Sequence, residues 1–262
     1  MFYPAPPTIN SVVDKLCRHL GYQIIVGESG RADAGVYWDI QTWRRPDPGL
    51  IRLSVEIPIL NLQCLDFSKH RIERVFHSVS GQSLHVEPRV HTGRFVVKSD
   101  VNAAHDGTIV EGPIDQAFDG RVCQRLVNNQ CDADTVVDLR TPVFGGVIPL
   151  VYKLYRPLTS RFDVNDSRAE IVAPAEVFTD GEMALLRHFT EAMGMDYGEH
   201  DVLRDADDGQ LWVVDANPTP WGPPRRLSPA DMTVAIERLS LAFERLVTDR
   251  INGFARSKDC TT

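Results

Sequence analysis

The sequence predicts a mixed α/β (α+β) fold, with helices toward both ends of the chain and a β-rich middle. Apolar residues recur at helical spacing in residues 11–20 and again in 229–251. Between Arg94 and Tyr155, short runs rich in β-branched residues are separated by Gly, Asn and Asp. Helical and strand patterns that share one chain in this way are typical of α/β and α+β proteins.

The first eighty residues are expected to form a small α/β lobe. A Pro- and Arg-rich segment, residues 43–58, predicts an irregular connection within it. We therefore expect a small N-terminal lobe over residues 1–80 and a larger domain over 81–262. The expected helices and strands of the lobe are residues 11–20, 69–78, 23–26 and 36–40.

In residues 81–262, the sequence pattern predicts mainly strands first and helices toward the end. Gly145-Gly146 suits the tight turn of a hairpin. Thr179-Asp-Gly-Glu182 has the spelling of a capping box and opens a helix through Met193, and the last long helix covers 229–251. The expected strands are residues 95–98, 108–111, 122–127, 135–143, 147–155, 199–203 and 211–216.

Composition narrows the classes of protein. Of the 262 residues, 43% are hydrophobic and the formal net charge is −8, without a basic run, which disfavours a nucleic-acid partner. No apolar stretch approaches the roughly 20 residues of a membrane span, and residues 1–10 do not resemble a signal peptide. The cysteines form no CxxC pair, which indicates free thiols and a cytoplasmic protein. They are Cys17, Cys64, Cys123, Cys131 and Cys260.

An acidic pair of strands is the main candidate for a functional site. Asp215 and Asn217 are two residues apart on an expected strand, so their side chains leave the same face. Asp201 lies on the preceding strand, and a short turn brings it opposite. Two carboxylates and an amide oxygen suit a magnesium ion that also takes phosphate oxygens. The alternative is a plain strand end with an Asx turn.

The surrounding string resembles the C-terminal signature of the ATP-grasp superfamily. Gly198-Glu-His-Asp201 is similar to its first part, with one extra residue. Asp215-Ala-Asn217-Pro-Thr-Pro220 matches the second, with Asp where many members carry Glu. The resemblance covers about half the chain. It implies an ATP-grasp fold of two β-rich lobes that clasp ATP, with Mg²⁺ held by Asp201, Asp215 and Asn217.

The same resemblance implies an ATP-binding set. Lys98 ends a strand and resembles the lysine that meets the nucleotide phosphates, followed by a lid loop that is poor in glycine here. Residues 122–127 resemble the strand that leads into the interlobe hinge, whose main chain reads adenine. The alternatives are a solvated lysine and a plain core strand. The implied hinge residues are Gln124, Arg125, Leu126 and Val127.

Two further strands carry basic residues. Asp138 and Arg140 share one face, as do Lys153 and Tyr155, while Arg156 is expected to point oppositely or to start the loop. The alternative is a set of cross-strand ion pairs. The resemblance implies that Arg140 and Arg156 are catalytic, facing the γ-phosphate and a substrate carboxylate, and that Lys153 binds ATP.

These expectations together describe an ATP- and Mg²⁺-dependent ligase that activates a carboxylate as an acyl phosphate for attack by an amine or a thiol. The alternatives are an ATP-grasp kinase acting on a hydroxyl and a nucleotide-binding module without turnover. The expected partners are small-molecule carboxylate and amine substrates, with no nucleic acid and no membrane, and a homodimer stays open. Residues 61–69 also resemble uncharacterised ATP-grasp proteins, without a role that the sequence assigns.

Overall fold

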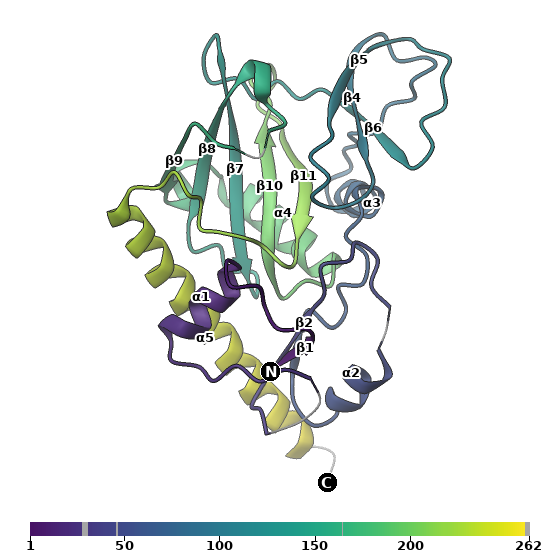
Figure 1. Ribbon diagram of the computed structural model, residues 1–262. Coiled ribbons are helices and arrows are strands. Elements are labelled where there is room, and N and C mark those ends of the chain that lie inside the picture. Colours follow the sequence, from purple (N-terminus) through teal and green to yellow (C-terminus); the bar gives the residue numbers. More distant parts are fainter. Residues whose placement is uncertain (28–30, 46, 164, 260–262) are drawn as a thin grey trace.

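The computed structural model describes residues 1–27, 31–45, 47–163 and 165–259. Within them, three sheets and the helices around them make up the fold (Figure 1). Cys260 lies outside the described residues, and the other four cysteines are free. No helix of the described part is long and apolar enough to cross a membrane.

The N-terminal part is built on a small parallel sheet with the strand order β1-β2-β3. The expected strand at 23–26 is wrong, because only Val26 forms an isolated bridge, to Phe2. The expected irregular segment 43–58 contains a helix, which begins where Asp47 caps it through its carboxylate. The elements are β1 (Phe2–Pro4), α1 (Val12–His19), β2 (Gly35–Trp38), α2 (Pro48–Leu53) and β3 (Ile59–Leu60).

The second sheet is antiparallel, with the order β5-β4-β6, from β4 (Gly93–Ser99), β5 (Thr108–Gly112) and β6 (Arg121–Arg125). One of its faces buries a small core around Phe95 and Val97. Lys98 alternates with these residues along β4 and therefore leaves the opposite face.

The third sheet is the largest, and its order is β11-β10-β7-β8-β9, antiparallel throughout. The hairpin at Gly145-Gly146 is confirmed: both glycines have positive φ, 56° and 82°, and Phe144 bridges Val147 beside them. The strand β9 was not expected. The strands are β7 (Thr135–Phe144), β8 (Val151–Pro157), β9 (Arg168–Val172), β10 (Tyr197–Arg204) and β11 (Leu211–Asn217).

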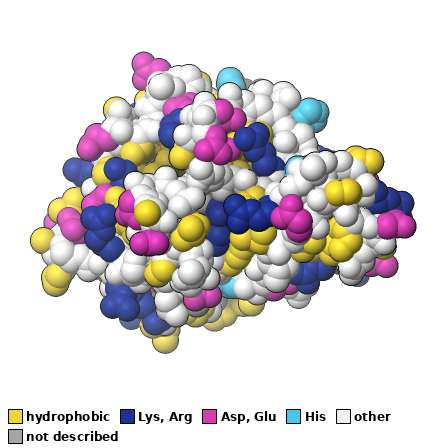
Figure 2. Space-filling model, turned by 90° about the horizontal axis from the view of Figure 1, so that it is seen from above, with side chains coloured by type: hydrophobic (Ala, Val, Ile, Leu, Met, Phe, Trp, Pro, Cys, Tyr) yellow, Lys and Arg dark blue, Asp and Glu magenta, His cyan; other side chains and the backbone are white. Residues whose placement is uncertain are grey.

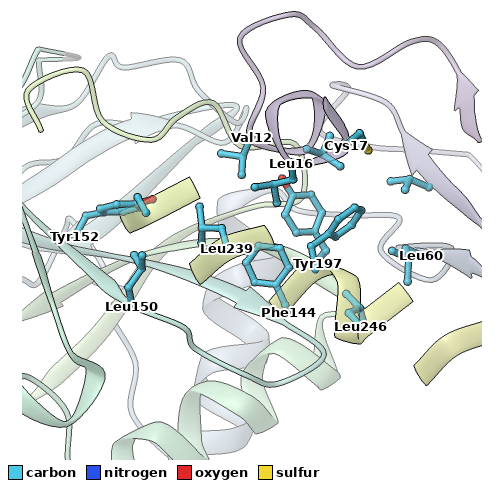
Figure 3. Close-up of a cluster of buried hydrophobic side chains, with 14 of the residues drawn as sticks. Val12, Leu16, Cys17, Leu60, Phe144, Leu150, Tyr152, Tyr197, Leu239 and Leu246 are labelled. Atoms are coloured by element: carbon cyan, nitrogen blue, oxygen red, sulfur yellow. The ribbon is translucent and has the colours of Figure 1, made fainter. Parts of the chain in front are cut away.

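Helices cover both faces of this sheet. One face packs on α3 (Lys69–Ser80) and α4 (Asp180–Ala192), which the capping box of Thr179 begins as expected. The other face packs on α1 and the long α5 (Pro229–Asp259) at one end only. Figure 3 shows Tyr197 and Phe144 of the sheet in this core, beside Leu16 of α1. The expected lobe boundary at residue 80 stays a prediction.

The far end of that second face carries polar side chains. There the small antiparallel sheet lies beside β11 (Figure 1). The ammonium group of Lys98 donates to the carbonyl of Val214 at 3.2 Å. The fold therefore brings the strand-ending lysine to the edge of the large sheet.

Candidate functional site

The acidic pair forms as the sequence predicts. Asp201 on β10 and Asp215 on β11 are direct partners in the antiparallel register, and a bulge follows at Val202. Residues opposite each other in such a pair place their side chains on the same face, a few ångströms apart. Asn217 lies one step further along the face and pairs with Glu199.

The amide of Asn217 is engaged in a turn. Its oxygen accepts hydrogen bonds from the main-chain N–H of Thr219 at 2.9 Å and from the Thr219 hydroxyl at 3.1 Å. This is the Asx turn that the sequence left open as the alternative. For Asn217 to bind a metal through this oxygen, the oxygen must leave the turn. The structure therefore brings Asp201 and Asp215 together without directing Asn217 at them.

Arg140, on the neighbouring strand β7, binds one member of the acidic pair, Asp201. Its Nε donates to one Asp201 oxygen at 2.9 Å and its Nη2 to the other at 3.5 Å. Burial opposes the charge of Arg140, but Asp201 and Glu199 outweigh it and raise its pKa. Burial likewise acts to raise the pKa of Asp201, and Arg140 outweighs it and lowers that pKa. Burial raises the pKa of Glu199 to about 8, with Arg140 opposing.

Arg156 lies on the same face as Arg140 and points away from the face of Lys153 and Tyr155, as the sequence predicts. Tyr152 is the register partner of Arg140, and alternation along β8 then brings Arg156 to that face. The residue is 5% exposed, and its guanidinium pairs with Asp138 and, at 2.8 Å, with Asp166. Arg156 therefore joins two strands and the loop before β9 beneath the acidic pair.

Lys153 is on the opposite face of the sheet. Its register partner is Leu139, which belongs to the core under α4, and its ammonium lies 4.0 Å from Glu170 on β9. The structure does not bring Lys153 to Arg140 and Asp201, which corrects its assignment to ATP. Without the strand register, the sequence could not decide whether Lys153 or its neighbour in the strand lies on the face of Arg140.

A second lysine, which the sequence did not assign, completes the site. The ammonium of Lys69 lies 3.6 Å from an Asp215 oxygen and donates to the Val101 carbonyl at 3.2 Å. Burial first, and then the charge of Lys69, lower the pKa of Lys98 to about 8. Lys69 is the first residue of α3, where the side chain of Ser68 caps the helix. The only sequence signal was the unassigned resemblance of residues 61–69.

The expected hinge follows β6. Gln124 is buried and pairs with Val96, so it shares the face of Lys98. The Arg125 side chain instead binds Asp205 at 2.9 Å and lies 5.5 Å above the ring of Trp212. That contact ties the small sheet to the large one and leaves only the main chain of Arg125 for a ligand.

The next two residues of the expected hinge, Leu126 and Val127, have little exposed surface. Leu126 is half-buried and Val127 is buried in the core under α4. The Val127 carbonyl accepts from Arg161 Nη2 at 2.8 Å and from the Asn129 N–H at 3.2 Å. A ligand that used this carbonyl would have to displace Arg161.

The expected lid is the loop between β4 and β5. His105 adopts a left-handed conformation there, with φ of 49°. Burial lowers the pKa of His105, while the charges of Asp215 and Asp201 oppose the shift. At Gly107 a β-carbon would lie 2.9 Å from the ring of Phe162, so a larger residue would force a shift at this contact with the β8–β9 loop.

Charge at this site is mixed. Seen from above, Lys and Arg side chains gather near the middle of the face, with Asp and Glu around them (Figure 2). In the part of the chain that the structure describes, no group of three or more His, Cys, Asp or Glu side chains could hold a metal. Asp201 and Asp215 nevertheless are hard oxygen donors directly opposite each other, which fits Mg²⁺ when phosphate oxygens supply the remaining ligands.

Comparison with solved structures identifies the fold. No family model and no curated protein sequence matches the chain. The ATP-grasp ligase PsnB, complexed with a phosphomimetic precursor variant, Mg and ADP, has a TM-score of 0.51 and 14% identity, over 76% of this chain and 64% of that chain.

The D-alanine–D-alanine ligase from Bacillus anthracis has a TM-score of 0.59 and 11% identity, over 98% of this chain and 97% of that chain. Its complex with ATP has a TM-score of 0.56 and 13% identity, over 96% and 93% of the two chains. These likenesses establish the architecture, which is the mixed α+β one that the sequence predicts. The chain has the ATP-grasp fold.

Proposed function

We propose that the chain is an ATP- and Mg²⁺-dependent ligase that activates a carboxylate as an acyl phosphate, which an amine or a thiol then attacks. One observation carries the proposal. The opposed carboxylates of Asp201 and Asp215 lie between two lysines, Lys69 and Lys98, on one side and the guanidinium of Arg140 on the other. Cationic side chains on both sides of the two carboxylates suit a polyanion, such as a triphosphate, that binds through a metal ion.

The lysines would hold the nucleotide. The charge of Lys69 lowers the pKa of Lys98, and a triphosphate would relieve that repulsion. The main chain of residues 124–127 would meet the adenine. Magnesium, when bound to Asp201 and Asp215, would offset the charge of the phosphate oxygens, and Asn217 would contribute only after leaving its turn.

The arginines would serve the carboxylate. A substrate oxygen attacks the γ-phosphorus, and ADP leaves with the electrons of the broken P–O bond. The amine nitrogen then attacks the carbonyl carbon, phosphate leaves with the C–O electrons, and the nitrogen releases a proton to solvent. Arg140 suits the planar acyl phosphate because its fork can donate to two oxygens at once. Arg156 keeps Asp138 and Asp166 in position beneath it.

The structural neighbours support this choice of reaction. PsnB is described as an ATP-grasp ligase and is complexed with Mg and ADP, and the B. anthracis ligase is complexed with ATP. Both names describe ligation, and neither describes phosphorylation of a hydroxyl. The substrates of this chain do not follow from them.

Product analysis tests the proposal. The purified chain is incubated with ATP, Mg²⁺ and a panel of carboxylic acids, with hydroxylamine as the nucleophile that traps an acyl phosphate. A ligase forms ADP and a hydroxamate in equal amounts with at least one acid. ADP with a phosphoester, and no hydroxamate, would identify a kinase. Binding of ATP with no ADP under any condition would identify a module without turnover.

A further inference from the structure

Asp100 binds the first turn of a helix to which it does not belong. It follows the end of β4, two residues after Lys98. Its carbonyl accepts the main-chain N–H of Lys69, the first residue of α3, at 3.3 Å, and its carboxylate accepts that of His70 at 2.9 Å. The second carboxylate oxygen lies 3.0 Å from the imidazole of His70. Because N–H groups of the first turn have no partner within their own helix, Asp100 supplies one and joins the two segments that carry the lysines.

The two residues that follow Asp100 hold the same junction. The Val101 carbonyl accepts from the ammonium group of Lys69 at 3.2 Å. The Asn102 N–H donates to the hydroxyl of Thr42 at 2.9 Å, and Thr42 is only 5% exposed. The Thr42 carbonyl in turn accepts the N–H of Phe67, just before α3, at 3.1 Å. The start of the expected lid is therefore fixed both to α3 and to the N-terminal part of the chain.

The two lysines of the site need such a support, because they repel each other. Burial and the charge of Lys69 lower the pKa of Lys98. Lys69 has the Asp215 carboxylate at 3.6 Å, whereas Lys98 donates to a neutral carbonyl, that of Val214. Ordering flexible side chains when a ligand arrives lowers its affinity. Contacts that fix both lysines beforehand should therefore strengthen the binding of a triphosphate.

We propose that Asp100 and Thr42 are positioning residues that hold the two lysines together for the phosphates of ATP. This inference rests on the proposed function and adds how that site is kept in position before the nucleotide binds. Asp100 acts through its neighbours, since its carboxylate already binds His70 and would repel phosphate. Its negative charge suits the role, because the first turn of a helix carries partial positive charge.

The test is calorimetric titration of the chain with adenosine and with a non-hydrolysable ATP analogue in Mg²⁺. Asp100→Ala should weaken the analogue about three- to tenfold, the range for freeing one or two side chains, and leave adenosine unchanged. Asp100→Asn keeps an acceptor for the His70 N–H and should restore most of the affinity. Asp115→Ala removes a carboxylate whose side chain is 90% exposed, and as the matched control it should bind as the wild type does.

Thr42→Val tests the same junction from its other side. Valine keeps the shape of the side chain but lacks the acceptor for the Asn102 N–H. The variant should weaken the analogue about threefold and leave adenosine unchanged, and it carries the test if Asp100→Ala does not fold. Thermal unfolding of each variant establishes that it is folded.

A double variant shows whether Asp100 acts through Lys69. In a Lys69→Met chain, which lacks the ammonium group, Asp100→Ala should weaken the analogue by less than about a further twofold. Residues that act on one group are not additive, whereas a purely structural effect of Asp100 would give the same loss with and without Lys69.

Three results would overturn the inference. They are wild-type affinity for the analogue in the folded variants at Asp100 and Thr42, an equal loss of affinity for adenosine, and the same loss from Asp100→Ala with and without Lys69. A wild type that binds the analogue and forms hydroxamate but shows any of these results loses only this inference. The expected losses without hydroxamate from any acid would overturn the ligase alone. No binding of the analogue to the wild type would contradict the nucleotide site and this inference with it.

Discussion

The ammonium group of Lys69 lies 3.6 Å from a carboxylate oxygen of Asp215, although the two residues are far apart in the sequence. The contact joins the start of α3 to the end of β11 and places a second lysine beside the acidic pair. Substitution of Lys69 can therefore test whether this lysine binds phosphate, with a lysine outside the site as the control.

Lys69→Met is expected to weaken Mg-ATP binding by about tenfold or more, because a charge-assisted contact to phosphate contributes about 1.5–3 kcal/mol. Adenosine, which has no phosphate, should bind the variant and the wild type alike. Lys153→Met is the matched control, since that lysine is on the other face of the sheet. Calorimetric titration measures the affinity of each protein for both ligands, and a larger loss of Mg-ATP affinity in Lys153→Met would refute the site as described.

Lys98 should make ATP binding depend on pH. Burial and Lys69 lower the pKa of Lys98 to about 8, so the free protein loses this charge as the pH rises through 8. Affinity for ATP should fall above that pH in the wild type and stay level there in Lys98→Met. Because the unfolded chain keeps its proton up to the ordinary pKa of 10.5, the unfolding free energy should rise with pH in that window. A pH series of ATP titrations checks the first effect and denaturant unfolding the second.

Arg140→Lys separates binding from chemistry. Lysine keeps the charge but lacks the planar guanidinium, which donates to both carboxylate oxygens of Asp201. ATP affinity should change by less than about threefold, while the rate of hydroxamate formation falls by roughly 10- to 100-fold, because the contact is made mainly in the transition state. Steady-state kinetics on an acid found by the panel measure the split. An unaltered rate would leave Arg140 as an ion-pair partner only.

Asn61 should stabilise the junction between the N-terminal part and β10. Its amide oxygen accepts from the N–H groups of Asp196 at 2.8 Å and Tyr197 at 3.0 Å, and its amide nitrogen donates to the Tyr197 carbonyl at 2.8 Å. Asn61→Ala leaves these buried groups unpaired and should cost about 2–4 kcal/mol of unfolding free energy. Asn128→Ala, which removes a solvent-exposed bond to Asp207, should cost less than about 1 kcal/mol. Equal losses in urea unfolding would contradict this account.

The sequence predicted much of the large sheet and the acidic pair, because those features are local. Alternating runs and turn residues mark strands, and one short turn sets Asp201 opposite Asp215. It missed β9, whose charged residues, Arg168 and Glu170, hide the alternation. It also missed β1, which is three residues long and depends on pairing with β2.

The rest of the site depends on tertiary contacts. Lys69 reaches Asp215 only because α3 packs on β11, and no spacing in the sequence encodes that distance. Lys153 was grouped with the ATP-binding residues although it lies on the opposite face from Arg140, because the sequence alone does not give the strand register that decides the face. The Asx turn of Asn217 was foreseen as an alternative, but only the structure reports the hydrogen bonds that form it.

The most direct measurement of the central claim is calorimetric titration of ATP, with and without Mg²⁺, into the wild type and Asp215→Asn. Removal of one of two opposed hard anionic ligands should abolish most of the Mg²⁺-dependent gain in affinity, a loss of about tenfold or more, while the fold stays intact. Asp119→Asn, at an exposed position with no described partner, should behave as the wild type does. Unchanged Mg-ATP affinity in Asp215→Asn would contradict the assignment of the acidic pair to magnesium and ATP.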